Sequence, residues 1–247
     1  MDRDCYYILA GETSADMLAA YLMRAVQQNV KQPISWMGIG GEQMQKVGLY
    51  SNTPISKLSV IGVLDAIASY NALLQIAKDQ IEQIILFRPK AIFTVDTKQF
   101  SLKFASLLRI EMDKVGWHAP IIQLVAPTVW AWGAWRAKKF EKIFDAILCL
   151  FPFEPSYFNQ KNTDAVFVGH PEAYKVVHQY EQNSPFKPIK QAGLIGLMPG
   201  SRMREISFNL FDILYSAKLF FNNFPKCRFI LPTTLKLEPL IKKQLKN

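Results

Sequence analysis

Cysteine and histidine are scarce in this chain of 247 residues, which contains three of each. The cysteines, Cys5, Cys149 and Cys227, lie far apart and form no C-x-x-C pair, so the sequence suggests neither a disulfide framework nor a zinc site. Three scattered histidines add no cluster of metal ligands. We therefore expect a protein of a reducing compartment that uses no metal and no other cofactor.

Long apolar runs are also absent. No uninterrupted apolar stretch approaches the roughly 18 residues that a membrane-spanning helix needs, and Met1 to Asp4 lack the basic and apolar regions of a signal peptide. Any membrane contact is therefore expected to be peripheral. The chain has no G-x-G-x-x-G, so we do not expect a nicotinamide or flavin dinucleotide site, and its spacing supports no Ser/His/Asp or Cys/His catalytic group.

Positive charge is plentiful. Lys and Arg outnumber Asp and Glu by 29 to 20, a formal net charge of +9, and half of the residues are hydrophobic. The apolar content is ample for a folded core. The charge favours partners that carry phosphate, namely nucleic acid, nucleotides or an anionic membrane surface, and does not choose among them.

Short apolar segments alternate with helical patterns along the chain. The predicted strands are Tyr6–Ala10, Ile34–Ile39, Ala91–Val95, Ile121–Val125, Ala146–Leu150, Ala165–Val168, Leu194–Met198 and Arg228–Leu231. The predicted helices are Asp16–Gln28, Ile61–Phe87, Phe100–Lys114, Trp130–Phe144 and Arg204–Phe221. This alternation predicts an α/β fold with a doubly wound parallel sheet, in which ligands bind beyond the carboxyl ends of the strands.

The polar stretch 178–185, which ends in a proline, is typical of a connection between domains. We predict a complete Rossmann-like domain over residues 1–175 and a partial second one over 176–247, which has room for two strands and two helices. An unfinished sheet of this kind leaves an open edge and apolar surface, which favours self-association as a homodimer.

The turn after the first predicted strand offers polar groups for a ligand. Gly11 permits close backbone approach, Ser14 can cap the next helix, and Glu12 or Asp16 could bind sugar hydroxyls. A capped turn without a ligand is an equally good reading of this segment taken alone.

Two further strand ends carry candidate groups. Asp96 follows Ala91–Val95, where a general base could deprotonate a bound hydroxyl, although it could also cap the next helix. His170 follows Ala165–Val168 and could touch a phosphate or a substrate hydroxyl, although a lone histidine is more often structural.

Three tryptophans, Trp130, Trp132 and Trp135, lie within six residues beside Arg136. Tryptophans next to basic residues could stack on sugars, bind acyl chains or anchor at a lipid interface. The alternative is that they belong to the core.

A strand, a tight turn and a helix start occur together near residue 200. Pro199 and Gly200 supply the bend, Ser201 can cap the backbone N–H groups of the helix, and Arg202 adds a guanidinium. A helix N-terminus attracts anions, so we predict a phosphate ligand here.

Seven segments, taken in order, carry a resemblance to a known family. They are Ala10-Gly11-Glu12-Thr13-Ser14-Ala15-Asp16, Val60-Ile61-Gly62-Val63, Val95-Asp96, Ala126-Pro127-Thr128-Val129-Trp130-Ala131-Trp132, Phe151-Pro152-Phe153-Glu154, Val168-Gly169-His170, and Met198-Pro199-Gly200-Ser201-Arg202 with Glu205. On these segments the chain resembles the lipid-A-disaccharide synthases, bacterial glycosyltransferases with two Rossmann-like domains (the GT-B type).

The resemblance implies a reaction without a metal. UDP-2,3-diacylglucosamine and 2,3-diacylglucosamine 1-phosphate would give the β-1,6-linked disaccharide phosphate and UDP, in the lipid A pathway of a Gram-negative bacterium. It implies that Asp96 is the base for the acceptor hydroxyl and that Arg202 stabilises the departing phosphates. Substrate contacts would come from residues in the other matching segments: Gly11, Glu12, Ser14, Asp16, Trp130, Trp132, His170, Gly200, Ser201 and Glu205.

The resemblance also implies a place in the cell. The enzyme would lie in the cytoplasm, peripherally on the anionic inner face of the inner membrane, with residues 1–175 as the acceptor side and 176–247 as an incomplete UDP-sugar side. It would not bind nucleic acid.

Some positions depart from the family. Lys98, Gln99, Phe100 and Ser101 stand where a Pro-Asp-Phe-Asn run is usual, and Ala15 stands where glycine is usual. Two alternatives stay open at this point. One is another GT-B enzyme that uses UDP-N-acetylglucosamine, and the other is a non-catalytic remnant or binding module that has lost the donor half.

Overall fold

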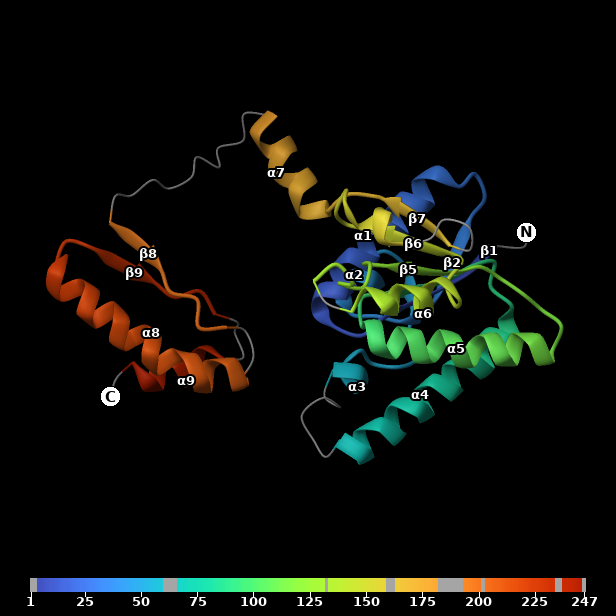
Figure 1. Ribbon diagram of the computed structural model, residues 1–247, viewed down its shortest axis with the longest axis horizontal. Coiled ribbons are helices and arrows are strands. Elements are labelled where there is room, and N and C mark those ends of the chain that lie inside the picture. Colours follow the sequence, from blue (N-terminus) through green and yellow to red (C-terminus); the bar gives the residue numbers. More distant parts are fainter. Residues whose placement is uncertain are drawn as a thin grey trace. The chain divides into compact units, whose positions relative to one another are not determined.

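The chain forms two compact units, Met1–His178 and Gln179–Asn247, which are described separately (Figure 1). The structure is a computed structural model. It describes residues 4–59, 66–131, 133–158, 163–181, 193–200, 203–233 and 237–245.

The first unit is built on a parallel sheet with the strand order β3-β2-β1-β4-β5-β6-β7. The strands are β1 (Asp4–Ala10), β2 (Ile34–Ile39), β3 (Leu49–Tyr50), β4 (Ile92–Val95), β5 (Ile121–Leu124), β6 (Ala146–Cys149) and β7 (Asp164–Phe167). All neighbouring strands pair in parallel. The direction of the order reverses between β1 and β4, and such a switch point is where doubly wound sheets bind ligands.

Helices connect these strands and cover both faces of the sheet. They are α1 (Thr13–Asn29), α2 (Glu42–Gln45), α3 (Ser56–Ser59), α4 (Ala66–Phe87), α5 (Lys98–Lys114), α6 (Ala137–Glu141) and α7 (Pro171–Glu181), with 3₁₀ turns at Ala134–Arg136 and Glu154–Tyr157. One apolar core joins α4, α5 and α6 to the sheet, and the other joins α1 and α2 to its opposite face. In Figure 1 the long helices α4 and α5 lie next to each other along one side of the sheet.

The second unit contains a small parallel sheet. Its elements are β8 (Leu194–Gly196), α8 (Met203–Asn223), β9 (Arg228–Ile230) and α9 (Glu238–Gln244), and β8 pairs with β9. Ile206 and Leu210 of α8 pack against Leu237 and Ile241 to form its core. The predicted fold class is therefore confirmed: a Rossmann-like domain followed by part of a second one.

Some predicted elements differ from the structure. The helix expected at Trp130–Phe144 is replaced by a turn, the 3₁₀ segment Ala134–Arg136 and the short α6, because Gly133 has a φ of 74°, which ends any helix before it. The first turn of α7 begins at Pro171, in a stretch for which we predicted no helix, and α7 ends at Glu181. The rest of the expected connection, 182–185, lies outside the described residues.

Candidate active site

Two turns meet at the switch point between β1 and β4. Gly11 follows β1, and a Cβ atom added to it would lie 2.6 Å from Cγ2 of Thr97, which follows β4. Only glycine lets the two turns approach this closely. Of the other residues predicted in the first turn, Glu12 is half-buried and Ser14 is exposed at the start of α1. Both turns thus lie at the carboxyl edge of the sheet.

Asp16 faces the interior of the first unit and is only 3% exposed. Its Oδ1 accepts hydrogen bonds from the backbone N–H groups of Gly41 and Met44, at 2.8 and 3.1 Å, and its Oδ2 accepts one from Gln43 at 3.0 Å. The carboxylate therefore caps α2 and holds the glycine-rich turn after β2. The predicted contact of Asp16 with substrate stays a prediction.

Asp96 lies directly after β4 in a left-handed conformation, with a φ of 54°, and Thr97 follows with a φ of 33°. Non-glycine residues rarely adopt this region, and consecutive ones are usual only where the surroundings hold them. The carboxylate is partly exposed, and its Oδ1 lies 3.7 Å from Nζ of Lys98. Asp96 is thus available at the carboxyl edge, as a general base requires.

Two buried side chains hold the backbone of Asp96. Its carbonyl oxygen accepts hydrogen bonds from Nε2 of Gln123 at 3.0 Å and from Oγ of Ser101 at 3.1 Å. Both residues are 0% exposed. Ser101, one of the departures from the family pattern, therefore has a definite role in this chain, which is to stabilise the turn after β4.

Gln123 was not among the predicted site residues. Its Oε1 accepts a 2.6 Å hydrogen bond from the hydroxyl of Thr94, and its Nε2 also donates to the carbonyl oxygens of Leu124 and Val125, at 2.9 and 3.3 Å. The signal available in the sequence was a lone amide within the apolar run Ile121–Val125. A buried amide of this kind needs partners, and here it ties the ends of β4 and β5 together.

A row of aromatic rings lies on the surface after β5, β6 and β7. Trp130 meets Phe153 edge to face at 5.4 Å between centroids, Phe153 stacks on Phe151 at 5.8 Å, and the Phe151 ring lies 6.4 Å from that of His170. Trp130 is 43% exposed and Trp135 is 64% exposed, so neither belongs to the core. We call Trp130, Phe153, Phe151 and His170 the aromatic row.

Local hydrogen bonds hold this row in place. Oε2 of the buried Glu154 accepts bonds from the backbone N–H groups of Leu150 and Phe151, both at 3.0 Å, and so fixes the turn after β6. Nδ1 of His170 accepts a 3.2 Å bond from the N–H of Glu172 at the start of α7. Because Nδ1 is an acceptor, the neutral His170 ring carries its proton on Nε2.

A hollow of about 570 Å³ opens beside Asp96, at the ends of β4 and β5. Three cationic residues contribute to its lining: Lys98, Arg136 and Lys139. Its apolar lining comes from three helices and includes Leu73, Phe100, Leu102 and Phe140. We call this space the basic hollow.

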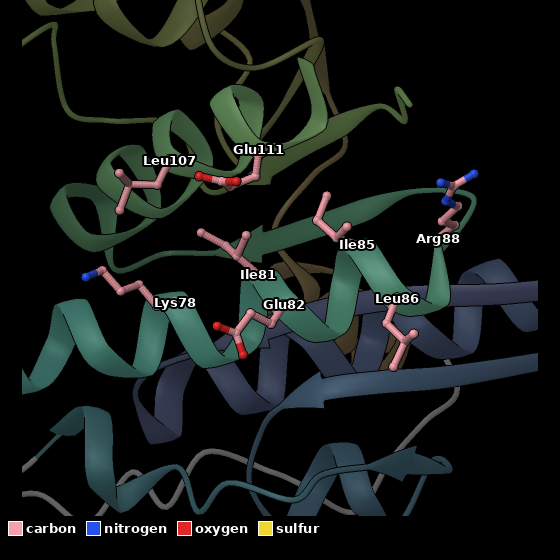
Figure 2. Close-up of a pocket in the computed structure, with 8 residues that line it drawn as sticks. All are labelled: Lys78, Ile81, Glu82, Ile85, Leu86, Arg88, Leu107 and Glu111. Atoms are coloured by element: carbon pink, nitrogen blue, oxygen red, sulfur yellow. The ribbon is translucent and has the colours of Figure 1, made fainter. Parts of the chain in front are cut away.

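A second hollow, of about 820 Å³, lies between α4 and α5 (Figure 2). Ile81 and Ile85 point from α4 toward α5, and the charged residues around them have both signs: Lys78, Arg88, Glu82 and Glu111. These residues come from the later parts of α4 and α5, away from the carboxyl edge of the sheet. The candidate site is therefore assigned to the basic hollow and Asp96.

The turn between β8 and α8 belongs to the second unit. Gly200 has a φ of 122°, and a Cβ atom added to it would lie 2.5 Å from Cβ of Glu205. Nδ2 of Asn209 donates a 3.1 Å bond to the carbonyl oxygen of Pro199. The turn after β8 thus folds back closely onto the first turn of α8.

Comparison with known proteins identifies the family of the chain. The family model described as lipid-A-disaccharide synthetase matches residues 6–247. The chain belongs to this family. A lipid-A-disaccharide synthase from Chromobacterium violaceum is 34% identical over 236 residues, which are 91% of this chain and 57% of that protein. The chain thus spans little more than half the length of this relative.

Solved structures support the fold of this lipid-A-disaccharide synthetase family member. The Staphylococcus aureus MnaA structure with UDP matches with a TM-score of 0.58 at 12% identity, over 98% of this chain and 64% of that one. The UDP-GlcNAc 2-epimerase from Neisseria meningitidis bound to UDP-GlcNAc matches with a TM-score of 0.55 at 10% identity, over 96% and 67%. At these identities the likeness concerns the fold, which is of the GT-B type.

Several residues of the family motifs lie outside the described residues. They are Trp132, the Val60-Ile61-Gly62-Val63 segment, Ser201 and Arg202. Their predicted roles therefore rest on the sequence. Within the part of the chain that is described, no helix is long and apolar enough to cross a membrane, and no group of three or more His, Cys, Asp or Glu side chains could hold a metal ion.

Proposed function

We propose that the chain carries the acceptor side and the first part of the donor side of a lipid-A-disaccharide synthase. The reaction would join UDP-2,3-diacylglucosamine to 2,3-diacylglucosamine 1-phosphate and release UDP. The observation that carries the proposal is Asp96, a partly exposed carboxylate that buried hydrogen bonds hold at the switch point of the sheet, next to the basic hollow. Family membership supports the choice of reaction.

Each proposed residue has a defined part in the reaction. Asp96 takes the proton of the acceptor hydroxyl while the oxygen attacks the anomeric carbon of the donor, and the bond from that carbon to UDP breaks. Arg202, together with Gly200 and Ser201 before α8, stabilises the negative charge on the departing phosphates. Gly11, Glu12, Ser14 and His170 line the acceptor side, and Glu205 supports the turn at Gly200.

The release of UDP tests this proposal. We expect the purified chain to release UDP only when both acylated sugars are present. Asp96→Asn should lower the rate about 10²- to 10⁴-fold, because the amide cannot accept the proton, and Arg202→Ala should also abolish most of the rate.

Matched variants make the test specific. Asp113→Asn removes a carboxylate at the end of α5, and Arg204→Ala removes an exposed guanidinium two positions after Arg202, so neither should change the rate. If the unaltered chain binds the sugars but releases no UDP, the proposal is wrong for this polypeptide, and the alternative of a non-catalytic binding module is favoured.

We further propose that three rings of the aromatic row, Trp130, Phe151 and Phe153, contact the anionic cytoplasmic face of the inner membrane. Trp130, Phe151 and Phe153 are each between 43% and 45% exposed, and Lys139 lies over the Trp135 ring at 5.0 Å. Exposed aromatic rings beside cations are the groups that an anionic lipid interface attracts. The predicted homodimer stays a prediction, with the exposed Phe208, Phe211 and Tyr215 of α8 as its candidate surface.

Liposome flotation measures this contact. The chain should bind anionic liposomes more tightly than neutral ones, and binding should weaken as salt is raised from low ionic strength, because salt screens exposed charges. A Trp130→Ser/Phe153→Ser double variant should bind severalfold less. Indifference to lipid charge and to salt would contradict the proposed contact.

A further inference from the structure

The basic hollow combines two kinds of surface that suit different parts of one ligand. Its charged residues, Lys98, Arg136 and Lys139, are all cations, and its described lining includes no carboxylate. By contrast, the hollow between α4 and α5 has cations and carboxylates side by side. A cluster of cations in a concave site favours a ligand that carries concentrated negative charge, such as a phosphate monoester.

Three separate elements bring these cations together. Lys98 is the first residue of α5, Arg136 ends the 3₁₀ segment, and Lys139 lies in α6. Gly133 makes room for one of them, because a Cβ atom added to it would lie 3.2 Å from Nε of Arg136. The fold of the Trp-rich segment thus presents Arg136 and Lys139 to the same space as Lys98.

The hollow also adjoins the candidate base. Nζ of Lys98 lies 3.7 Å from Oδ1 of Asp96, so the cationic lining begins next to the carboxylate that would take the proton. A ligand whose phosphate reached these cations would hold its sugar hydroxyls near Asp96. The lining also has an apolar part, Leu73 of α4, Phe100 and Leu102 of α5 and Phe140 of α6, which suits an acyl chain. Thr97, Gln99 and Thr128 add uncharged polar groups.

We infer that the basic hollow is the acceptor subsite: Lys98, Arg136 and Lys139 bind the phosphate of an acylated sugar phosphate, and the side chains of Leu73, Phe100, Leu102 and Phe140 bind one of its acyl chains. This inference rests on the proposed function for the identity of the sugar. Binding of the phosphate in this subsite positions the acceptor sugar, so that its attacking hydroxyl stays next to Asp96 during the reaction.

A binding measurement tests the subsite without turnover. Isothermal titration would compare 2,3-diacylglucosamine 1-phosphate with 2,3-diacylglucosamine, which lacks the phosphate. Arg136→Gln/Lys139→Gln should weaken binding of the phosphorylated sugar by about 100-fold, at about tenfold for each charge-assisted contact, and change binding of the unphosphorylated sugar less than about threefold. Lys139 is exposed, so Lys139→Gln alone keeps the test valid if the double variant folds poorly.

A charge-matched control is available in the other hollow. Lys78→Gln/Arg88→Gln removes the same net charge from the same unit and should leave both affinities unchanged. The inference is overturned if the unaltered chain binds neither sugar, if it does not prefer the phosphorylated one, or if Arg136→Gln/Lys139→Gln weakens both equally. Absence of UDP release with the binding preference intact would instead overturn the proposed function and leave the subsite standing.

Discussion

Alanine at position 38 should lower the free energy of unfolding of the first unit by about 4 kcal/mol or more, the largest effect that we expect for a single methyl group. Gly38 lies in β2 with a φ of 139°, and a Cβ atom added to it would lie 1.9 Å from the carbonyl oxygen of Ile8. Ile8 of β1 is the register partner of Gly38, so the backbones of β1 and β2 would have to move apart. A side-chain rotation cannot relieve such a clash.

Hydrogen exchange of the β1 and β2 amides would measure this loss. Exchange at these amides reports the opening of the first unit, independently of the stability of the second unit. Gly116→Ala is the matched control. Gly116 also has a positive φ, 60°, but no atom lies within 4 Å of its added Cβ, so only the backbone preference is lost, about 1 kcal/mol. Equal losses at the two positions would contradict the role given to the contact with Ile8.

Replacing Gln123 with leucine should lower the free energy of unfolding by about 3 kcal/mol, because it leaves buried partners without hydrogen bonds. Among the described hydrogen bonds, the amide is the sole partner of the Thr94 hydroxyl and of the Val125 carbonyl oxygen. It also donates to the carbonyl oxygens of Asp96 and Leu124, which keep bonds from the Ser101 hydroxyl and from the N–H of Asp96. We also expect UDP release to fall more than tenfold with little change in KM, because the left-handed backbone of Asp96 loses one of its two side-chain contacts.

Urea unfolding and steady-state kinetics would separate the two effects. Gln75→Leu is the control, because Gln75 is exposed on α4 and bonds only to the exposed Asp79 among the hydrogen bonds described. Gln123→Glu keeps the acceptor for Thr94 but turns a buried carboxylate oxygen toward three carbonyl oxygens, so it should lower stability at least as much as Gln123→Leu. Full activity in Gln123→Leu would show that Ser101 alone holds the turn.

The sequence predicted the first unit well because its strands are signalled locally. The strands at Ile34–Ile39 and Ala146–Cys149 are short apolar runs between polar helices, and their ends agree with the structure to within a residue. A parallel sheet then follows, and with it the carboxyl edge where Asp96 lies. The position of Asp96 directly after a predicted strand was therefore sufficient to place it at this edge.

The contacts that hold the site could not be predicted in the same way. Gln123 reaches Asp96 only after β4 and β5 have paired, and Asp16 reaches Gly41 only after α1 has packed beside α2. Neither pairing leaves a periodic signal in the sequence. The exposed Trp130 and Trp135 were ambiguous for the same reason, because composition does not indicate which face of an irregular segment meets solvent.

The strand order has a consequence for synthesis on the ribosome. β1 emerges first and lies in the interior of the finished sheet, between β2 and β4. The edge of β1 that pairs with β4, where Ala10 lies opposite Val95, stays unpaired until residues 92–95 have left the exit tunnel. The nascent chain therefore carries an apolar, half-paired strand through the translation of α4, a stage at which chaperone binding would protect it from aggregation.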